Sequence, residues 1–366
     1  GVTGALTITS GSSATLNSDT GEVDINGTVF RGPGAGTING INLRANTSST
    51  ANVLEVQSMD IAATATFRVR GTSAIILLSD STVHIGGLVD VSASCSDGGM
   101  SCPGPGGGVG SGPLNFAAGC GPGGDGNLGS DCNFNPESAG GGGGGLGATG
   151  ANGGNTINTN CTPTTCCDKL DGGPAGVACG TAPLVPLVGG SGGGASANSG
   201  GGGGGGALQI TAMQQLTMDQ SAAINAAGGG GQGARQDRFG VYQSGGGGGG
   251  SGGAVLLESP TLSIGSGVII AANGGGGGSG DTPGAGQAGQ LSITSAALGG
   301  CDAGCQDVGG NGGVGSSPPT GGIAVGAHVA SGGGGAVGRI RLNATTLTTT
   351  GAQFSPAPST GQPVYQ

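Results

Sequence analysis

Ten cysteines carry the clearest chemistry of this chain, and their surroundings favour disulfide bonds over metal binding. An even number of cysteines in glycine-rich sequence is typical of disulfides formed in an oxidising compartment. A zinc site would need paired Cys-x-x-Cys motifs or interleaved histidines, and the only two histidines, His84 and His328, lie outside the cysteine-rich stretches. The cysteines are Cys95, Cys102, Cys120, Cys132, Cys161, Cys166, Cys167, Cys179, Cys301 and Cys305.

The short spacings between cysteines predict local bridges. We expect the pairs Cys95–Cys102, Cys120–Cys132 and Cys301–Cys305. The other four cysteines would form two more bridges, and the sequence leaves their pairing open. Each bridge would stabilise a loop that has little apolar core by about 2–4 kcal/mol.

Carboxylates are the other residues able to do chemistry, and their placement argues against an enzyme. Hydrolysis of a glycosidic bond needs two carboxylates about 5–9.5 Å apart. The carboxylates of the repeated units stand singly and at no common position, so no stacked pair is expected: Asp60, Asp80, Asp90, Asp219 and Glu258. Asp90 and His84 each lie between two apolar residues and are expected to point outward into solvent. We therefore expect no catalytic residue, no cofactor and no metal ligand.

The charge of the chain excludes some partners. Lysine and arginine total 9 against 19 aspartates and glutamates, a formal net charge of −10. Nucleic acid and anionic membranes need a concentrated basic face, so neither is expected as a partner. No run of 18 apolar residues occurs, and Gly1 is expected to be a mature N-terminus left after secretion. Aspartates near the loops leave calcium open, although no EF-hand loop occurs.

A repeated strand-turn-strand unit must position these residues. In its best copy, short apolar runs at 254–257, 262–264 and 268–270 are separated by polar or turn residues and flanked by glycine tracts. Runs this short, rich in Val, Ile and Leu and bounded by Gly and Pro, predict strands.

Other stretches repeat this unit. Residues 77–94 align without a gap with 256–273, which places Val83 on Leu262, Ile85 on Ile264 and Val91 on Ile270. Residues 207–227 repeat the unit with one extra residue, and 290–298 and 338–356 are partial copies. Stacked copies of one short unit predict strands that pair in parallel and in register.

The 95 glycines are concentrated between the copies, and each glycine loop leaves the repeat after its last strand. Disorder is the alternative for such sequence, and collagen is excluded because a strict Gly-X-Y period is missing. Loops that leave from one corner must lie beside one another, and glycine tracts could then bond laterally, amide to carbonyl, as three-residue-per-turn extended helices.

The expected fold is all-β: a right-handed parallel β-solenoid (β-helix) with polyglycine-II-like loops packed along one side. Its parts are an N-terminal solenoid at 1–94, a disulfide-bonded insertion at 95–206, a C-terminal solenoid at 207–356 and an extended tail at 357–366.

The repeat, a glycine tract followed by AVLLESPTLSIGSGVIIAANGGGGG, resembles the glycine-rich parallel β-helix proteins on the surfaces of environmental bacteria. The glycine tracts are similar to the polyglycine-II bundles of springtail antifreeze proteins and phage tail-fibre adhesins. This resemblance covers about residues 70–94 and 200–356 and includes no catalytic motif. The phage adhesins carry aromatic residues at loop tips for receptor binding, which implies that role here for Phe239, Tyr242, Phe116 and Phe134.

We expect a non-enzymatic structural subunit that assembles head to tail into an extracellular filament or surface appendage. A solenoid has two open ends with unpaired strand edges, and the sequence shows no cap. The candidate assembly segments are the first strand and the tail: Ala5, Leu6, Thr7, Ile8, Pro356, Pro363, Val364 and Tyr365. One alternative is an adhesin that binds a glycan or a surface receptor, which should expose an aromatic cluster. The other is an ice-binding protein, which should expose a flat, Thr-rich face.

Overall fold

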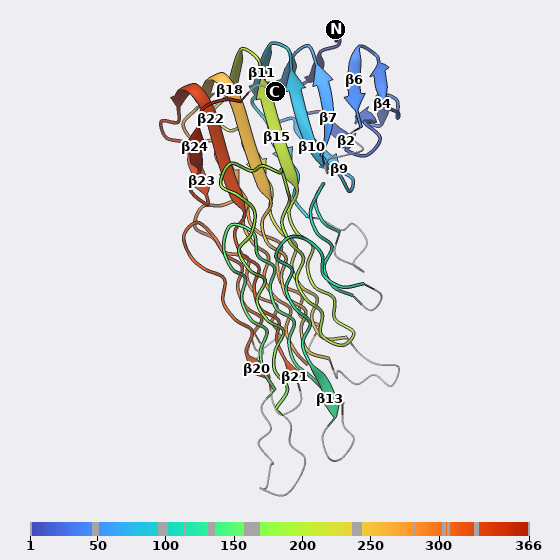
Figure 1. Cartoon of the computed structure of the whole chain (residues 1–366), viewed down its shortest axis with the longest axis vertical. Helices are drawn as coiled ribbons and strands as arrows, with labels where there is room; N and C mark the ends of the chain where they lie inside the picture. The colour runs from blue at the N-terminus through green and yellow to red at the C-terminus, as the bar shows by residue number, and fades with distance from the viewer. Residues whose placement is uncertain are drawn as a thin grey trace, which may run out of the picture.

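The computed structural model describes residues 2–45, 51–93, 102–112, 115–130, 136–156, 169–235, 244–281, 283–301, 305, 308–325 and 329–364. In these ranges all regular secondary structure is β-strand, and no helix occurs. Figure 1 shows paired strands at one end of an elongated molecule and glycine-rich segments that run away from them. We call these two parts the sheet body and the glycine bundle.

Two sheets form the sheet body, and a small third sheet lies at the far end of the glycine bundle (Figure 1). The first holds β1 (Leu6–Ile8), β5 (Gly36–Ile38), β6 (Ile41–Arg44), β7 (Ala51–Val56), β8 (Met59–Ile61), β10 (Ala74–Ser79), β11 (Thr82–Ile85), β15 (Ala207–Ala212), β16 (Gln215–Met218), β18 (Ala254–Ile264), β22 (Arg339–Thr348) and β24 (Ser359–Gly361). The second holds β2 (Ser13–Asn17), β3 (Val23–Ile25), β4 (Thr28–Arg31), β9 (Thr66–Arg70), β12 (Leu88–Asp90), β17 (Ala223–Asn225), β19 (Ile269–Ala271) and β23 (Gln353–Ser355). The third holds β13 (Leu128–Ser130), β14 (Pro136–Ser138), β20 (Ala324–Val325) and β21 (Val329–Ala330).

Successive copies of the repeat pair with one another in parallel. Val83 of β11 lies in line with Leu262 of β18 through β16, as expected. The expected match of Val91 to Ile270 is wrong, because Val89 lies in line with Ile270 through β17. The segment from Ile264 to Ile270 is two residues longer than the corresponding segment from Ile85 to Val89. A shift of two residues keeps the same side chains facing inward, so the apolar pattern alone does not reveal it.

Stacked inward side chains form the core of the sheet body. In the column of Met59, Val83, Leu216 and Leu262, each side chain is at most 2% exposed. Full burial of a Val, Leu or Ile side chain contributes about 1.5–3 kcal/mol. In-register aliphatic columns therefore supply a core to a chain whose aromatic content is only 2%.

The sheets are mixed, because antiparallel strands close the N-terminal end. On one side β3 and then β4 add antiparallel to β2, and on the other β6 and then β5 add antiparallel to β7. The turns at Asn26-Gly27 and Asn39-Gly40 have positive φ at all four residues, the geometry that folds a strand back as a tight hairpin. Residues 23–44 therefore do not form further parallel copies.

Arg31 fills the interior of this end. Its side chain is fully buried and donates hydrogen bonds to the carbonyl oxygens of Gly21, Gly32, Gly34, Gly36 and Ile41. No cap was expected from the sequence, but hairpins and a buried arginine cover part of this end, while β1 pairs only with β8 in the described residues. The arginine satisfies turn carbonyls that would otherwise be buried without donors.

The C-terminal tail folds back onto its own sheet. Residues 359–361 form β24, which pairs in parallel with Arg341, Leu342 and Asn343 of β22. The backbone N–H of Val364 donates to Glu258 at 2.7 Å. The tail is extended, as expected, and its residues 359–361 pair within the chain.

Residues 290–298 do not form the partial copy expected of them. They contain no strand, and β22 follows β18 directly in the first sheet. The carbonyls of Gln290 and Ser292 instead accept hydrogen bonds from the Asn273 side chain. Ile293 and Leu298 are exposed, so this stretch contributes none of the stacked core.

The glycine tracts run side by side and bond laterally, amide to carbonyl, as expected. Amides three residues apart donate to the same neighbour, which is the period of an extended helix with three residues per turn. In the tract 200–206, Gly201 and Gly204 donate to the segment 108–111, and Gly202 and Gly205 donate to the segment 248–251. Each tract is therefore held from several sides.

Close backbone approach explains why these tracts consist of glycine. A methyl group added at Gly202 would overlap the carbonyl oxygen of Gly229, and one at Gly250 would overlap that of Gly203. Any larger residue would push the tracts apart and break their lateral hydrogen bonds.

The cysteine-rich insertion is anchored on the outer face of the first sheet. A second apolar cluster joins Leu146, Leu184 and Leu187 of the insertion to strand residues that include Ala207 and Leu256. This cluster lies outside the main core. The insertion is thus held by packing as well as by covalent bonds.

Candidate functional site

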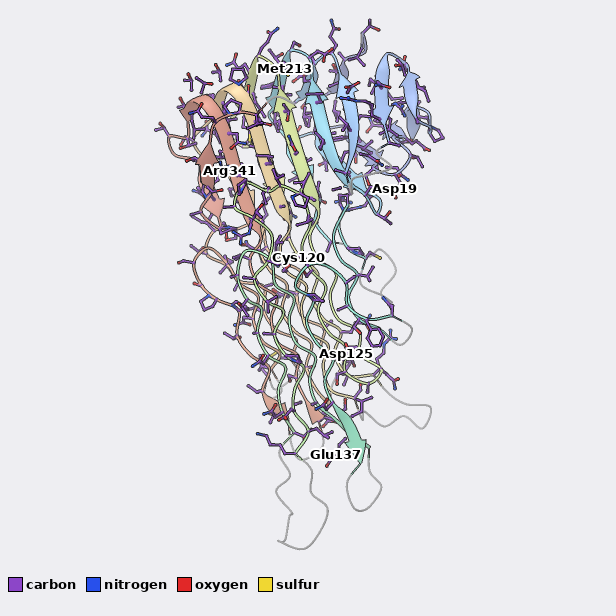
Figure 2. The ribbon with its side chains drawn as sticks, viewed as in Figure 1. Asp19, Cys120, Asp125, Glu137, Met213 and Arg341 are labelled. Atoms are coloured by element: carbon purple, nitrogen blue, oxygen red, sulfur yellow. A yellow bond between two sulfur atoms is a disulfide. The ribbon has the colours of Figure 1, made fainter. Side chains whose placement is uncertain are left out.

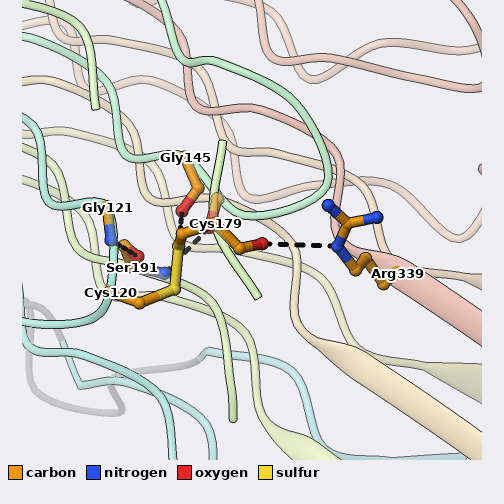
Figure 3. Close-up of a disulfide and its surroundings, with 7 residues drawn as sticks. Cys120, Gly121, Gly145, Cys179, Ser191 and Arg339 are labelled. Carbon is orange, nitrogen blue, oxygen red and sulfur yellow. Dashed lines mark hydrogen bonds between the residues drawn. A yellow bond between two sulfur atoms is a disulfide. The ribbon is translucent and has the colours of Figure 1, made fainter. Parts of the chain in front are cut away.

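A disulfide bond marks the place where the glycine bundle leaves the sheet body. Cys120 pairs with Cys179, and their Cα atoms lie 5.9 Å apart (Figure 3). The expected bridge between Cys120 and Cys132 is therefore wrong. The insertion folds back on itself, so that a cysteine 59 residues away is closer in space than sequence spacing suggests. Figure 2 places Cys120 just beyond the sheet body.

The surroundings of this bridge tie it to the first sheet. Arg339, the first residue of β22, donates through Nε to the carbonyl oxygen of Cys179 at 3.3 Å (Figure 3). The amide of Cys179 donates to the carbonyl of Leu146 at 2.9 Å, and the amide of Gly121 donates to the Ser191 hydroxyl at 2.9 Å. The bridge thus lies at the boundary between the sheet body and the glycine bundle.

The remaining cysteines are described only in part. The expected pair Cys301–Cys305 is confirmed, with Cα atoms 4.7 Å apart. Cys102 is also disulfide-bonded. Its expected partner Cys95 lies outside the described residues, as do Cys132, Cys161, Cys166 and Cys167.

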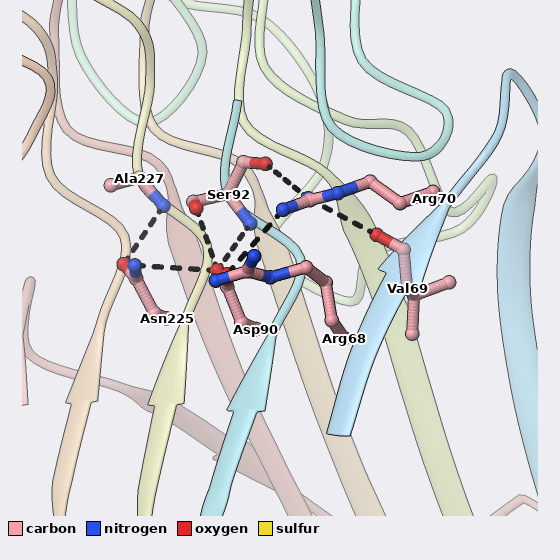
Figure 4. Close-up of polar contacts among 7 residues, drawn as sticks. All are labelled: Arg68, Val69, Arg70, Asp90, Ser92, Asn225 and Ala227. Atoms are coloured by element: carbon pink, nitrogen blue, oxygen red, sulfur yellow. Dashed lines mark hydrogen bonds and ion pairs between the residues drawn. The ribbon is translucent and has the colours of Figure 1, made fainter. Parts of the chain in front are cut away.

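Asp90 is the last residue of β12, at a second place where the chain leaves the sheet body. Arg68 donates to its carboxylate at 3.0 Å, and the Ser92 hydroxyl donates to it at 2.6 Å (Figure 4). Arg70 and Asn225 complete the group, and Asp90 is only 4% exposed. The expectation that Asp90 faces solvent is therefore wrong. Its register partners on β9 and β17 are Arg68 and Asn225, whose side chains donate hydrogen bonds to it.

His84 brings together two carboxylates that the sequence appeared to scatter. Its Nδ1 lies 2.6 Å from Asp60 and its Nε2 lies 2.7 Å from Asp219. Asp60 is the register partner of His84 on β8, and Asp219 follows directly after β16. His84 does point outward, as expected. The two carboxylates do not share one register position, since Asp60 lies in line with His84 and Thr217 and not with Asp219, but the imidazole contacts both.

The two carboxylates favour the protonated, positively charged form of His84. Hydrogen bonds to Asp60 and then to Asp219 raise the pKa of His84 above its ordinary value, against a smaller opposing effect of burial. The imidazole occupies the space between the two carboxylates, so it joins three neighbouring strands by charge. When it is protonated, the imidazole forms ion pairs with both carboxylates.

Of the candidate assembly residues that the structure describes, only Leu6, Thr7 and Ile8 lie in a paired strand. Leu6, Thr7 and Ile8 pair in parallel with β8, while Ala5 precedes this strand and is exposed. Pro356 follows β23 through a cis peptide bond. Pro363 and Val364 follow β24, and Tyr365 lies outside the described residues.

Exposed apolar side chains on the glycine bundle follow from its construction, because an interior of bonded glycine backbones has no room for them. Phe116 is 85% exposed, Leu128 is 62% exposed and Val177 is 61% exposed. No aromatic cluster is formed by the described residues. The other aromatic residues expected at loop tips, Phe134, Phe239 and Tyr242, lie outside them.

A layer of buried serines lies near the far end of the bundle, and the sequence reasoning missed it. The hydroxyls of Ser138 and Ser196 lie 2.6 Å apart, and those of Ser199 and Ser244 lie 3.0 Å apart. The amide of Gly245 donates to Ser138. The signal was available, because serine stands at or next to the distal end of several glycine tracts. Figure 2 places the neighbouring Glu137 at this far end.

The outer face of the first sheet carries a short hydroxyl array. Thr346 and Thr348 of β22 lie in register with Thr261 and Ser263 of β18. The next copies place Gln215 and Thr217 there, and the copy beyond them brings His84. The Thr-rich face expected of an ice-binding protein is therefore interrupted after a few strands.

Comparison with known proteins found no match: no protein-family model, no curated protein and no solved structure matches this chain. In the described part of the chain, no helix is long and apolar enough to cross a membrane. The same part contains no group of three or more His, Cys, Asp or Glu side chains placed to hold a metal ion.

Proposed function

We propose that the sheet body is a right-handed parallel β-solenoid and that the tracts form a polyglycine-II-like bundle on it. The parallel in-register pairing of β10, β15, β18 and β22 supports the solenoid. The handedness follows the strong preference of parallel crossover connections. The three-residue period of the lateral hydrogen bonds supports the bundle.

We propose further that the chain is a non-enzymatic structural protein of the cell exterior that works as a display scaffold. Its bundle would hold the far end away from the sheet body, as in a receptor- or glycan-binding adhesin. The observation that carries this proposal is the bundle itself, because tracts bonded on several sides make a stiff spacer out of glycine. Two disulfides within it are compatible with an oxidising exterior.

A binding experiment tests the display proposal. The purified chain is applied to a glycan array and to intact cells, beside the variants Leu128→Ser, Ile323→Ser and Val177→Ser. All three side chains are exposed on the bundle, but Leu128 and Ile323 lie in or beside the third sheet and Val177 is close to the Cys120–Cys179 bridge. We expect the two distal variants to weaken binding and Val177→Ser to leave it unchanged.

Two outcomes would overturn the proposal. One is the absence of binding to every surface. The other is release of new reducing or unsaturated sugar ends from a polysaccharide, which would identify an enzyme.

A filament subunit is the second candidate function, and one observation favours it: Leu347, in the part of β22 that β24 does not cover, is 37% exposed. Head-to-tail stacking is obstructed over part of each end, because β3 to β6 and β24 occupy places where a neighbour's strands would have to lie. In the described residues, β1 and residues 344–348 each keep one unpaired edge. Negative-stain microscopy of the intact chain decides between single elongated particles and fibres.

A further inference from the structure

The two ends of the stacked strands are closed to different degrees. At the N-terminal end, antiparallel strands extend both sheets and Arg31 fills the space between them. In the described residues β1 pairs only with β8, but its Leu6 is fully buried. These strands and their turns also carry charges, among them Glu22, Asp24 and Arg44. Charged side chains on edge strands oppose pairing with another chain.

The C-terminal end is closed over part of its width only. β24 pairs with residues 341–343 of β22, and in the described residues no strand pairs with 344–348 on the side away from β18. The side chains of residues 345–348 are all exposed. A row of unpaired backbone groups therefore remains available to another extended strand.

The apolar core also ends without a lid at this place. Leu347 continues the column of Leu262, Leu216 and Val83, which are at most 1% exposed, yet Leu347 itself is 37% exposed. Phe354 of β23, which packs against the same core, is also only partly buried. Covering Leu347 would complete the column and remove its apolar surface from water.

The chemistry of this edge identifies the partner that suits it. From Leu342 to Gln366 the sequence holds no charged residue and no histidine. Two copies of this end can therefore approach each other without like-charge repulsion, and each offers the other an extended strand with an exposed leucine. An interface of this kind, in which the same patch meets itself, is isologous.

We propose that two copies of the chain associate end to end, with residues 344–348 of β22 pairing antiparallel about a two-fold axis close to Leu347. The antiparallel direction follows from the two-fold, because a strand rotated about a perpendicular axis runs the opposite way. Because a two-fold contact uses the same patch on both copies, the assembly closes at two chains and a fibre does not form. This inference is independent of what the far end of the bundle binds.

Sedimentation equilibrium of the intact, disulfide-bonded chain tests it. We expect the mass of two chains for the natural sequence and for Met213→Asp, a control at an exposed apolar residue after β15. Leu347→Asp should sediment with the mass of one chain. Circular dichroism establishes that this variant keeps its strands.

A cross-link keeps the test decisive if Leu347→Asp fails to fold. Leu347→Cys should yield a covalent dimer on a non-reducing gel after mild oxidation, and Met213→Cys should not. A natural chain that stays monomeric at all concentrations overturns the proposal. Open-ended polymers would also overturn it and would favour the filament.

Discussion

The backbone N–H of Val364 donates a hydrogen bond of 2.7 Å to Oε1 of Glu258, 106 residues earlier in the chain. Glu258 is 3% exposed and also accepts hydrogen bonds from the side chains of Gln209 and Asn343. One buried carboxylate on β18 thus links strands on both sides of it to the C-terminal tail.

Loss of this carboxylate should loosen the tail. Hydrogen bonds to a charged group contribute about 1.5–3 kcal/mol each, and a buried partner left alone adds a cost. We expect Glu258→Ala to lower the free energy of unfolding by about 2–3 kcal/mol and to speed hydrogen exchange at residues 359–361. The measurements are chemical denaturation and exchange followed by mass spectrometry.

Glu55→Ala is the matched control, because Glu55 takes the same position of the repeat in β7. Its side chain is 18% exposed, pairs with Arg44 and accepts a hydrogen bond from Asn42, but no hydrogen bond to the tail depends on it, so exchange at residues 359–361 should not change. An equal effect of the two variants on this exchange would contradict the role assigned to Glu258.

The bridge between Cys120 and Cys179 predicts a specific peptide map. Mass spectrometry of the unreduced, digested chain should yield a linked Cys120–Cys179 peptide and a linked Cys301–Cys305 peptide. Replacing both Cys120 and Cys179 by serine should cost about 2–4 kcal/mol, the usual range for a disulfide. A linked Cys120–Cys132 peptide would contradict the structure.

Close packing of the glycine tracts predicts that a single methyl group is harmful there. We expect Gly202→Ala to lower the free energy of unfolding by about 1–3 kcal/mol, the usual cost of overpacking. Gly32→Ala is the control, since nothing lies within 4 Å of a methyl group at that position and its effect should stay within about 0.5 kcal/mol. Thermal unfolding of both variants makes the comparison, and an unchanged Gly202→Ala would argue against a packed bundle.

Much of the sheet body could be predicted from the sequence, because its core depends on a local pattern. Alternating apolar residues such as Leu262 and Ile264 determine which side chains face inward, and their recurrence determines which strands stack. The exact register was less accessible. Corners of different length preserve the inward pattern, so Val89 and Val91 are equally good partners for Ile270 on pattern alone.

The N-terminal closure and the polar clusters depend on contacts that short sequence windows do not contain. Asn-Gly pairs such as Asn26-Gly27 and Asn39-Gly40 favour hairpin turns, but the burial of Arg31 follows only once both hairpins lie across one end. His84 and Asp219 are 135 residues apart, and a long insertion separates them. Such pairs become neighbours only after the copies are placed in register.

The ion pairs of His84 with Asp60 and Asp219 predict a pH dependence of stability with a definite sign. Its pKa is raised in the folded chain by hydrogen bonds to Asp60 and Asp219, while in the unfolded chain it lies near the ordinary value of about 6.5. The stabilisation is therefore complete below about pH 6.5 and is lost as the pH rises through the folded pKa. Because the side chain of His84 is 41% exposed, solvent screening limits the effect to less than about 1 kcal/mol. NMR titration of the imidazole gives the folded pKa directly, and unfolding curves across this range give the stability. His84→Gln should remove this part of the pH dependence, whereas a folded pKa at or below the ordinary value would show that the two carboxylates do not hold the charge.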